Sequence, residues 1–108
     1  MDSQWHEICT LKRLIREQRL SLRLGAHSVL VLWDAGQALA FENRCPHQGY
    51  PLDNALLDPD RRTLTCPFHQ WAFALDSGQC QLNTSCLQRF PVRIEADAVQ
   101  IGIPADPC

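Results

Sequence analysis

The sequence predicts an all-β domain built from small antiparallel sheets. Apolar residues alternate with polar ones at Leu20, Leu22 and Leu24, and this period of two is typical of a half-buried strand. The β-branched and aromatic run Val29–Trp33 favours a buried strand. Short strand-like segments recur between turn signals, and no long helical pattern interrupts them. Together these observations predict one all-β domain over residues 1–108.

Alternation and turn signals set the expected elements in order. Strands are predicted at residues 5–9, 20–24, 29–33, 38–42, 63–65, 71–75, 91–95 and 99–103. Turns at Gly25–Ser28 and Ala96–Ala98 predict hairpins between the strands on either side. Residues 11–15 have helical spacing, and we expect at most one helical turn there. Trp5 and Ile8 are the expected core residues of the first strand.

The middle of the chain is expected to be less regular. Residues 54–57 should be irregular or barely extended, and Asp58-Pro59-Asp60 has the composition of a turn. Asp76–Gln79 is expected to form a further turn, followed by a loose segment that ends at Leu87.

Composition and charge narrow the class of protein. The chain has 108 residues and is 45% hydrophobic, enough for a core without disulfide bonds. Its net charge of −2 provides no basic field that would attract nucleic acid. The longest uninterrupted apolar run, Val29–Trp33, is far shorter than the roughly 20 residues of a membrane helix, so no membrane partner is expected. Basic residues gather in segment 12–23, as a solvated face or as a docking surface.

The six cysteines do not indicate a secreted disulfide scaffold. The start Met1–Gln4 lacks the basic and apolar regions of a secretory signal, so a cytoplasmic location is expected. Cys9 is interpreted as a small buried hydrophobic residue. Whether Cys80 and Cys86 pair stays open, because the sequence does not show their separation.

Two short motifs each offer one thiolate and one imidazole. They are Cys45-Pro46-His47 and Cys66-Pro67-Phe68-His69. Such ligands select zinc, copper or iron-sulfur sites. A Cys-x-His pair suits structural zinc poorly, whereas a Rieske 2Fe-2S centre needs two cysteines on one iron and two histidines on the other. A zinc site, or buried residues without metal, remains the alternative.

The extended motifs resemble one family. Cys-x-His-x-Gly-x-x-Leu from Cys45 to Leu52, followed by Cys-Pro-x-His from Cys66 to His69, resembles the Rieske ferredoxin family. The similarity continues through Phe73-x4-Gly78 and Phe90–Ile94, so it covers most of the chain.

The resemblance implies a ligand set and a fold. Cys45 and Cys66 would bind one iron of a single 2Fe-2S cluster, and His47 and His69 would bind the other. The implied architecture is a Rieske-like fold with two metal-binding loops at one end. The cluster-binding subdomain would span about residues 43–85.

The resemblance also implies a function. A monomeric electron carrier, not an enzyme in its own right, would pass single electrons from a reductase to a terminal oxygenase. His47 and His69 would form the electron port, because the histidine-bound iron would lie nearest solvent. Two alternatives stay open. One is the small Rieske-like subunit of an assimilatory nitrite reductase, and the other is a zinc-stabilised or redox-sensing interaction module.

Four further positions predict a low reduction potential. By resemblance, high-potential members carry a disulfide between the two loops and hydroxyl side chains that donate to sulfur. The disulfide positions correspond to Tyr50 and Phe68, and the hydroxyl positions to Trp71 and Phe73. None of these residues can play the corresponding part, so we expect a potential near the lower end of the Rieske range.

Overall fold

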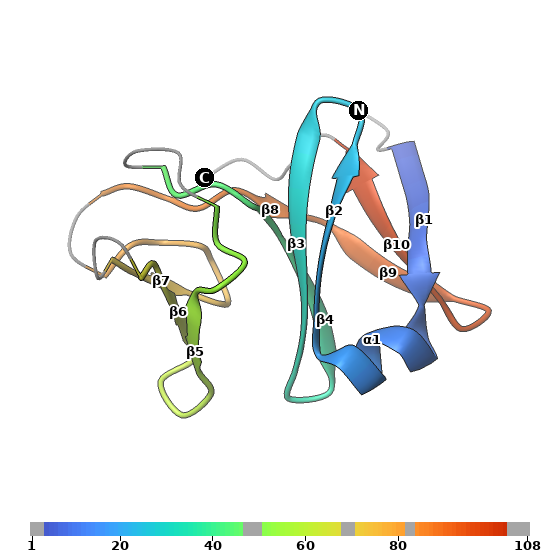
Figure 1. The fold of residues 1–108 in the computed structure, drawn as a ribbon, viewed down its shortest axis with the longest axis horizontal. Coiled ribbons are helices and arrows are strands. Elements are labelled where there is room, and N and C mark those ends of the chain that lie inside the picture. The colour runs from blue at the N-terminus through green and yellow to red at the C-terminus, as the bar shows by residue number, and fades with distance from the viewer. Residues whose placement is uncertain (1–3, 47–50, 68–70, 82–83, 104–108) are drawn as a thin grey trace.

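The computed structural model describes residues 4–46, 51–67, 71–81 and 84–103 (Figure 1). These residues form ten strands and one short helix, which confirms the all-β prediction. In chain order the elements are β1 Gln4–Thr10, α1 Leu11–Glu17, β2 Arg19–Leu24, β3 His27–Asp34, β4 Gln37–Glu42, β5 Leu56–Asp58, β6 Thr63–Thr65, β7 Ala72–Ala74, β8 Arg89–Phe90, β9 Val92–Glu95 and β10 Ala98–Ile103. Within the described ranges, no helix is long and apolar enough to cross a membrane.

The described strands form three small antiparallel sheets. The central sheet has the strand order β2-β3-β4-β8, and it contains the predicted hairpin of β2 and β3. Strands β5, β6 and β7 form a second sheet, which we call the loop sheet because the second cysteine motif lies between β6 and β7. The third sheet, in the order β1-β10-β9, contains the predicted C-terminal hairpin and pairs the first strand of the chain with the last.

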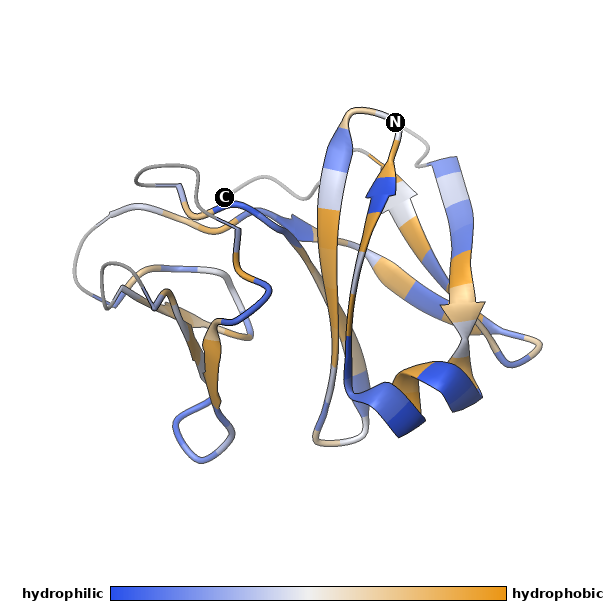
Figure 2. Cartoon of the chain, viewed as in Figure 1, coloured by the Kyte–Doolittle hydropathy of each residue, from blue (hydrophilic) through white to orange (hydrophobic). Residues whose placement is uncertain are grey.

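The central sheet separates two hydrophobic cores, because side chains alternate across a strand. Leu30 and Leu32 of β3 belong to one core, and Val29 and Val31 belong to the other. The loop-side core consists of Leu30, Leu32, Leu39, Phe41, Cys45, Leu52, Ala55, Leu64, Cys66, Phe73, Leu75, Cys80 and Leu87. The helix-side core consists of Leu14, Val29, Val31, Ala40, Phe90, Val99 and Ile101. Facing both cores, β3 is hydrophobic along most of its middle (Figure 2).

The helix is longer than the single turn that the sequence predicts, since α1 runs over Leu11–Glu17. The side-chain oxygen of Thr10 accepts a hydrogen bond of 3.1 Å from the backbone N–H of Arg13 and caps the first turn. A hydrogen-bonded ion pair of 2.7 Å between Arg13 and Glu17 supports the second turn and lowers the pKa of Glu17. Leu14 is completely buried, so tertiary packing adds to these local contacts.

Two short strands and one side chain also differ from the prediction. β5 occupies part of the segment expected to be irregular, because Leu57 pairs with Leu64 of β6. β8, which follows the segment expected to be loose, pairs with β4. Ile8 packs against the helix-side core as predicted. Trp5 is only half-buried, and the guanidinium of Arg93 lies over its ring at 4.3 Å from the centroid.

Candidate metal centre

Both motif cysteines lie beyond strand ends and are completely buried. Cys45 follows β4 after a short turn, and Cys66 comes directly after β6, whose bounds match the predicted strand 63–65. Both residues belong to the loop-side core. The fold therefore brings together two potential thiolate donors that are well separated in the sequence.

Asn43 braces the first loop, which we define as residues 43–53. Its side-chain oxygen accepts a hydrogen bond of 2.5 Å from the backbone N–H of Leu52, and its side-chain N–H₂ group donates to the carboxylate of Asp53. Its backbone N–H donates to the carbonyl oxygen of Ser28 on β3 at 2.8 Å. Asn43 is only 7% exposed, and a buried amide is costly unless it is hydrogen-bonded. The partners that satisfy it here join the two ends of the loop.

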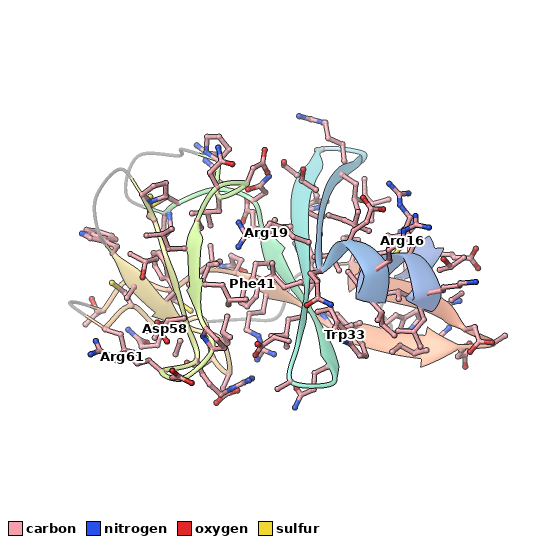
Figure 3. All side chains as sticks on the ribbon, turned by 60° about the horizontal axis from the view of Figure 1, so that its bottom comes forward. Arg16, Arg19, Trp33, Phe41, Asp58 and Arg61 are labelled. Carbon is pink, nitrogen blue, oxygen red and sulfur yellow. The ribbon has the colours of Figure 1, made fainter. Side chains whose placement is uncertain are left out.

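A second contact ties the end of the first loop to the central sheet. Nη1 of Arg19, on β2, donates a hydrogen bond of 2.7 Å to the backbone carbonyl oxygen of Asp53. Figure 3 shows Arg19 and Phe41 in the region between the central sheet and the loop sheet. Leu52, next to Asp53, is completely buried in the loop-side core. Polar contacts and apolar burial thus act together on this end of the loop.

The second loop, which we define as residues 66–71, is closed by its own backbone. The N–H of Cys66 donates to the carbonyl oxygen of Trp71 at 2.8 Å, so one hydrogen bond joins the first and last residues of the loop. The side chain of Trp71 is half-buried and packs against the loop-side core. Its ring meets that of Phe73 edge to face, with centroids 6.5 Å apart. Trp71 therefore covers part of the core that holds both cysteines.

The backbone path of the segment that follows β7 depends on Gly78. Its φ of +80° lies in the left-handed region, and a Cβ atom there would lie 2.1 Å from the carbonyl oxygen of Leu87. Its N–H donates to the carbonyl oxygen of Ala74, and its own carbonyl oxygen accepts from the N–H of Leu87, both at 2.7 Å. Backbone conformation and close approach both require glycine, which gives the Phe73-x4-Gly78 pattern a physical cause.

An ion pair connects the loop sheet to the central sheet. Nη1 of Arg62 lies 2.5 Å from Oδ2 of Asp34 at the end of β3, and Nη2 lies 3.3 Å from Asp76. Asp34 is only 8% exposed. The backbone carbonyl oxygen of Arg62 also accepts a hydrogen bond of 2.9 Å from the N–H of Leu75. The turn before β6 is therefore held from both sheets.

Of the four predicted ligands, the structure describes two. Cys45 and Cys66 come together in one core, whereas His47 and His69 lie outside the described residues. The further positions Tyr50 and Phe68, predicted to affect the reduction potential, also lie outside them.

The sequence reasoning missed the residues that hold the loops, namely Arg19, Asp34, Asn43, Asp53 and Arg62. Only Asn43 had a usable local signal. It is a short amide directly after a strand and two residues before a ligand motif, and asparagine at such a position commonly bonds nearby backbone.

Two other described cysteines, Cys80 and Cys9, lie in or against a hydrophobic core. Cys80 is a free thiol buried in the loop-side core, so it does not pair with Cys86. Cys9 packs against the helix-side core, and burial raises the pKa of its thiol. Cys9 therefore stays neutral near pH 7 and acts as a small hydrophobic residue, although it is only partly buried and not fully buried as predicted.

The described donor set suits an iron-sulfur or zinc centre. Thiolate ligands select zinc, copper(I) and iron-sulfur clusters. Two cysteines buried in an apolar core would be costly as thiolates unless bound cations balance their charge. Cys45 and Cys66 thus fit the thiolate half of a 2Fe-2S cluster, and on chemistry alone they also fit zinc.

Comparison with known proteins bears on the choice between a 2Fe-2S cluster and zinc. Residues 4–92 match the family model of the Rieske 2Fe-2S domain. The ferredoxin component of the alkene monooxygenase system of Xanthobacter autotrophicus (strain ATCC BAA-1158 / Py2) is 32% identical over 103 residues, which cover 94% of this chain and 83% of the relative. Longer relatives match over a small part of their length, 16% in one case and 25% in another.

Solved structures have the same fold. A chain in the complex of reduced oxygenase and oxidised ferredoxin in carbazole 1,9a-dioxygenase superposes with a TM-score of 0.83 at 24% identity, over 96% of this chain and 97% of that one. A Mycobacterium tuberculosis protein assigned as the small subunit of an NADH-dependent nitrite reductase gives 0.82 at 22% identity, over 98% and 100%. At these identities the likeness concerns the fold alone. Because the family model matches most of its length and one relative is 32% identical, this chain belongs to the Rieske 2Fe-2S domain family.

Proposed function

We propose that this chain is an electron carrier that holds one Rieske-type 2Fe-2S cluster and passes single electrons from a reductase to a terminal oxygenase. Cys45 and Cys66 would bind one iron, and His47 and His69 the other. The observation that carries the proposal is the burial of both cysteines in one core beyond strand ends. When bound at such a site, the cluster supplies one-electron redox chemistry.

The chain's own residues would position the ligands. Asn43 and Arg19 fix the end of the first loop, and the hydrogen bond from Cys66 to Trp71 closes the second. Ligands held on braced loops need less rearrangement when the metal binds. The packing of Trp71 and Leu52 against the loop-side core would also keep water away from the cysteines.

We further propose that residues 43–85 act as a cluster-binding subdomain. The loop sheet and both loops fall in this range. Its ion pair from Arg62 to Asp34 would hold the subdomain against the central sheet.

One observation favours a carrier in an oxygenase system over the nitrite reductase subunit. The ferredoxin component of an alkene monooxygenase system is 32% identical and is matched over 83% of its length, so that relative consists mostly of this one domain. The nitrite reductase small subunit shares the fold at 22% identity, which carries no functional weight. A monomeric state and a cytoplasmic location remain predictions from the sequence.

Two measurements test the proposal. The first is metal analysis of anaerobically purified protein, where we expect two irons and two acid-labile sulfides per chain, with the visible and EPR spectra of a Rieske centre. Zinc without sulfide would instead support the interaction module.

The second measurement is turnover with reductase and oxygenase pairs, using NADH as the electron source. We expect the chain to couple NADH oxidation to oxygenation of substrate. Electron delivery only to a sirohaem nitrite reductase would replace the oxygenase assignment with the subunit alternative.

A further inference from the structure

The basic residues of this chain divide into those with internal partners and those without. The chain has ten lysines and arginines, and all ten lie in the described residues. Seven side chains have partners: Arg13 and Arg16 pair with Glu17, Arg61 with Asp58, Arg62 with Asp34 and Asp76, and Arg93 with Glu95, while Arg19 and Arg89 donate to the backbone carbonyls of Asp53 and Asp76. The side chains of Lys12, Arg23 and Arg44 have no hydrogen bond or ion pair to any residue that the structure describes.

Two of these three unpartnered side chains line the same hollow. A pocket of about 310 Å³, which we call the hairpin pocket, is lined by Arg23, Ala26, Ser28, Glu42, Asn43, Arg44 and Pro51. It lies where the β2–β3 hairpin meets the two ends of the first loop. Arg23 and Arg44 are both exposed. Lys12, the third, lines a different pocket, formed by α1 and the turn between β9 and β10.

The chemistry of the hairpin pocket fits one carboxylate. Two guanidiniums and the hydroxyl of Ser28 are available as donors, and a guanidinium binds a carboxylate through charge-assisted hydrogen bonds. Glu42 also lines the pocket and leaves it a net charge of one positive unit. That balance suits a singly charged side chain better than a phosphate, which carries up to two negative charges.

The position of the pocket points to a protein as the source of that carboxylate. Arg44 precedes the ligand motif directly, and Pro51 belongs to the far end of the same loop. Asn43, which braces the loop, forms part of the pocket wall. A protein that placed an acidic side chain here would rest against the loop that carries Cys45 and His47.

We propose that the hairpin pocket is a docking site for an aspartate or glutamate side chain of the oxygenase that accepts the electron. This inference rests on the proposed function, because it needs an oxygenase that receives the electron from this chain. The pocket orients the bound partner and raises the rate at which the two proteins meet, because charges at the edge of an interface mainly change the association rate. We therefore expect the partner to present an acidic residue at the rim of its own redox site.

Matched charge reversals test the proposal in the cluster-loaded protein. The variants are Arg23→Glu and Arg44→Glu, and the control is Lys12→Glu, which changes the net charge equally at an exposed, unpartnered residue of another pocket. The measurement is the second-order rate of electron transfer to the oxygenase that turns over with the wild-type chain, at several salt concentrations. We expect each arginine reversal to slow transfer by about 3- to 10-fold at low salt, with a smaller loss at high salt. Lys12→Glu should stay within about 2-fold of wild type.

A variant of opposite sign sharpens the test. Glu42→Gln removes the one negative charge of the pocket, so it should speed transfer to the same oxygenase. Arg23 lies on β2, outside both loops, so Arg23→Glu remains informative even if Arg44→Glu impairs cluster loading.

A small uncharged oxidant separates partner docking from an effect of the variants on the cluster itself. Oxidation of the reduced variants by such an oxidant should change much less than transfer to the oxygenase. Equal losses with both acceptors, equal losses in Lys12→Glu, or unchanged transfer in both arginine variants would overturn the docking site. If the wild-type chain reduces no oxygenase at all, the proposed function itself fails, which is a distinct result.

Discussion

The guanidinium of Arg62 and the carboxylate of Asp34 lie 2.5 Å apart and connect the loop sheet to the central sheet. Asp34 is 8% exposed, whereas the Arg62 side chain is 29% exposed. The acidic partner is thus almost removed from water, and it depends on the arginine for compensation. Loss of one member of such a pair leaves an uncompensated buried group, which costs more than loss of an exposed pair.

Replacing Asp34 by asparagine should therefore destabilise the protein. Asp34→Asn keeps the shape of the side chain but removes the charge that faces Arg62, and we expect a loss of about 2 kcal/mol. The matched control is Asp58→Asn, whose pair with Arg61 spans 3.8 Å and is exposed on both sides. The control should cost less than about 0.5 kcal/mol. Thermal unfolding of the cluster-loaded proteins gives the comparison, and equal melting temperatures of the two variants would contradict it.

Loss of either motif cysteine should remove the cluster and reduce stability. Binding energy at a metal site adds to folding energy when the site is absent from the unfolded chain. We expect Cys45→Ser and Cys66→Ser to lose the visible absorption and to melt at a lower temperature, and we expect the same of His69→Ala. Cys80→Ser is the control, because Cys80 is buried in the same core but lies outside the ligand motifs. A wild-type spectrum in any of the three ligand variants would remove that residue from the ligand set.

The brace at Asn43 can be tested by exchanging its donor and acceptor with Asp53. In Asn43→Asp, the carboxylate still accepts from the N–H of Leu52, but it faces the carboxylate of Asp53 and repels it. We expect weaker cluster retention and a broader EPR spectrum of the reduced protein, because the ligand loop is less well fixed. The double variant Asn43→Asp/Asp53→Asn restores one donor and one acceptor and should recover most of the loss. No recovery would show that the pair does not hold the loop.

The outcome for individual residues shows where sequence reasoning succeeds. The alternation that predicted β2 and the β-branched, aromatic run that predicted β3 are local properties of the chain, and both strands formed where expected. The length of α1 was underestimated because the complete burial of Leu14 depends on packing against distant strands. β8 was missed for a similar reason, since Arg89 pairs with Phe41 far back in the sequence.

The candidate site likewise has a part that the sequence predicts and a part that it does not. Ligand chemistry depends on residue type and close spacing, so Cys45 and Cys66 could be selected from the motif, and the structure places both in one core. Their role as ligands stays a prediction. The contact from Arg62 to Asp34 joins residues that are remote in sequence, so no local pattern indicates it.

Substitution of Gly78 should be far more costly than substitution of another glycine with nearly the same backbone conformation. Gly78 and Gly36 have φ values of +80° and +76°, but only at Gly78 would a Cβ atom meet backbone, the carbonyl oxygen of Leu87. We expect Gly36→Ala to cost about 1 kcal/mol from backbone strain. Gly78→Ala adds a steric clash and should cost about 3 kcal/mol or more. Thermal unfolding measures both, and similar losses would mean that the Leu87 segment can move aside.

The reduction potential should lie near the lower end of the Rieske range, about −150 mV, because the positions that, by resemblance, carry hydroxyl donors to sulfur in high-potential members have none here. At the two described positions where the resemblance places hydroxyl donors, the chain has Trp71 and Phe73, and neither carries a hydroxyl. Phe73 is completely buried in the core that holds both cysteines. Fewer donors leave the negative charge on sulfur less stabilised, which favours the oxidised state.

Phe73→Tyr adds a hydroxyl at one of these positions and should raise the potential. A hydrogen bond worth about 1.4 kcal/mol more in the reduced state corresponds to about 60 mV for one electron. Phe41→Tyr is the matched control, because Phe41 is a completely buried phenylalanine of the same core at a position without that correspondence. Protein-film voltammetry measures all three proteins. A wild-type potential well above zero would mean that other donors reach the sulfur atoms, and equal shifts in both variants would mean that Phe73 has no special place beside them.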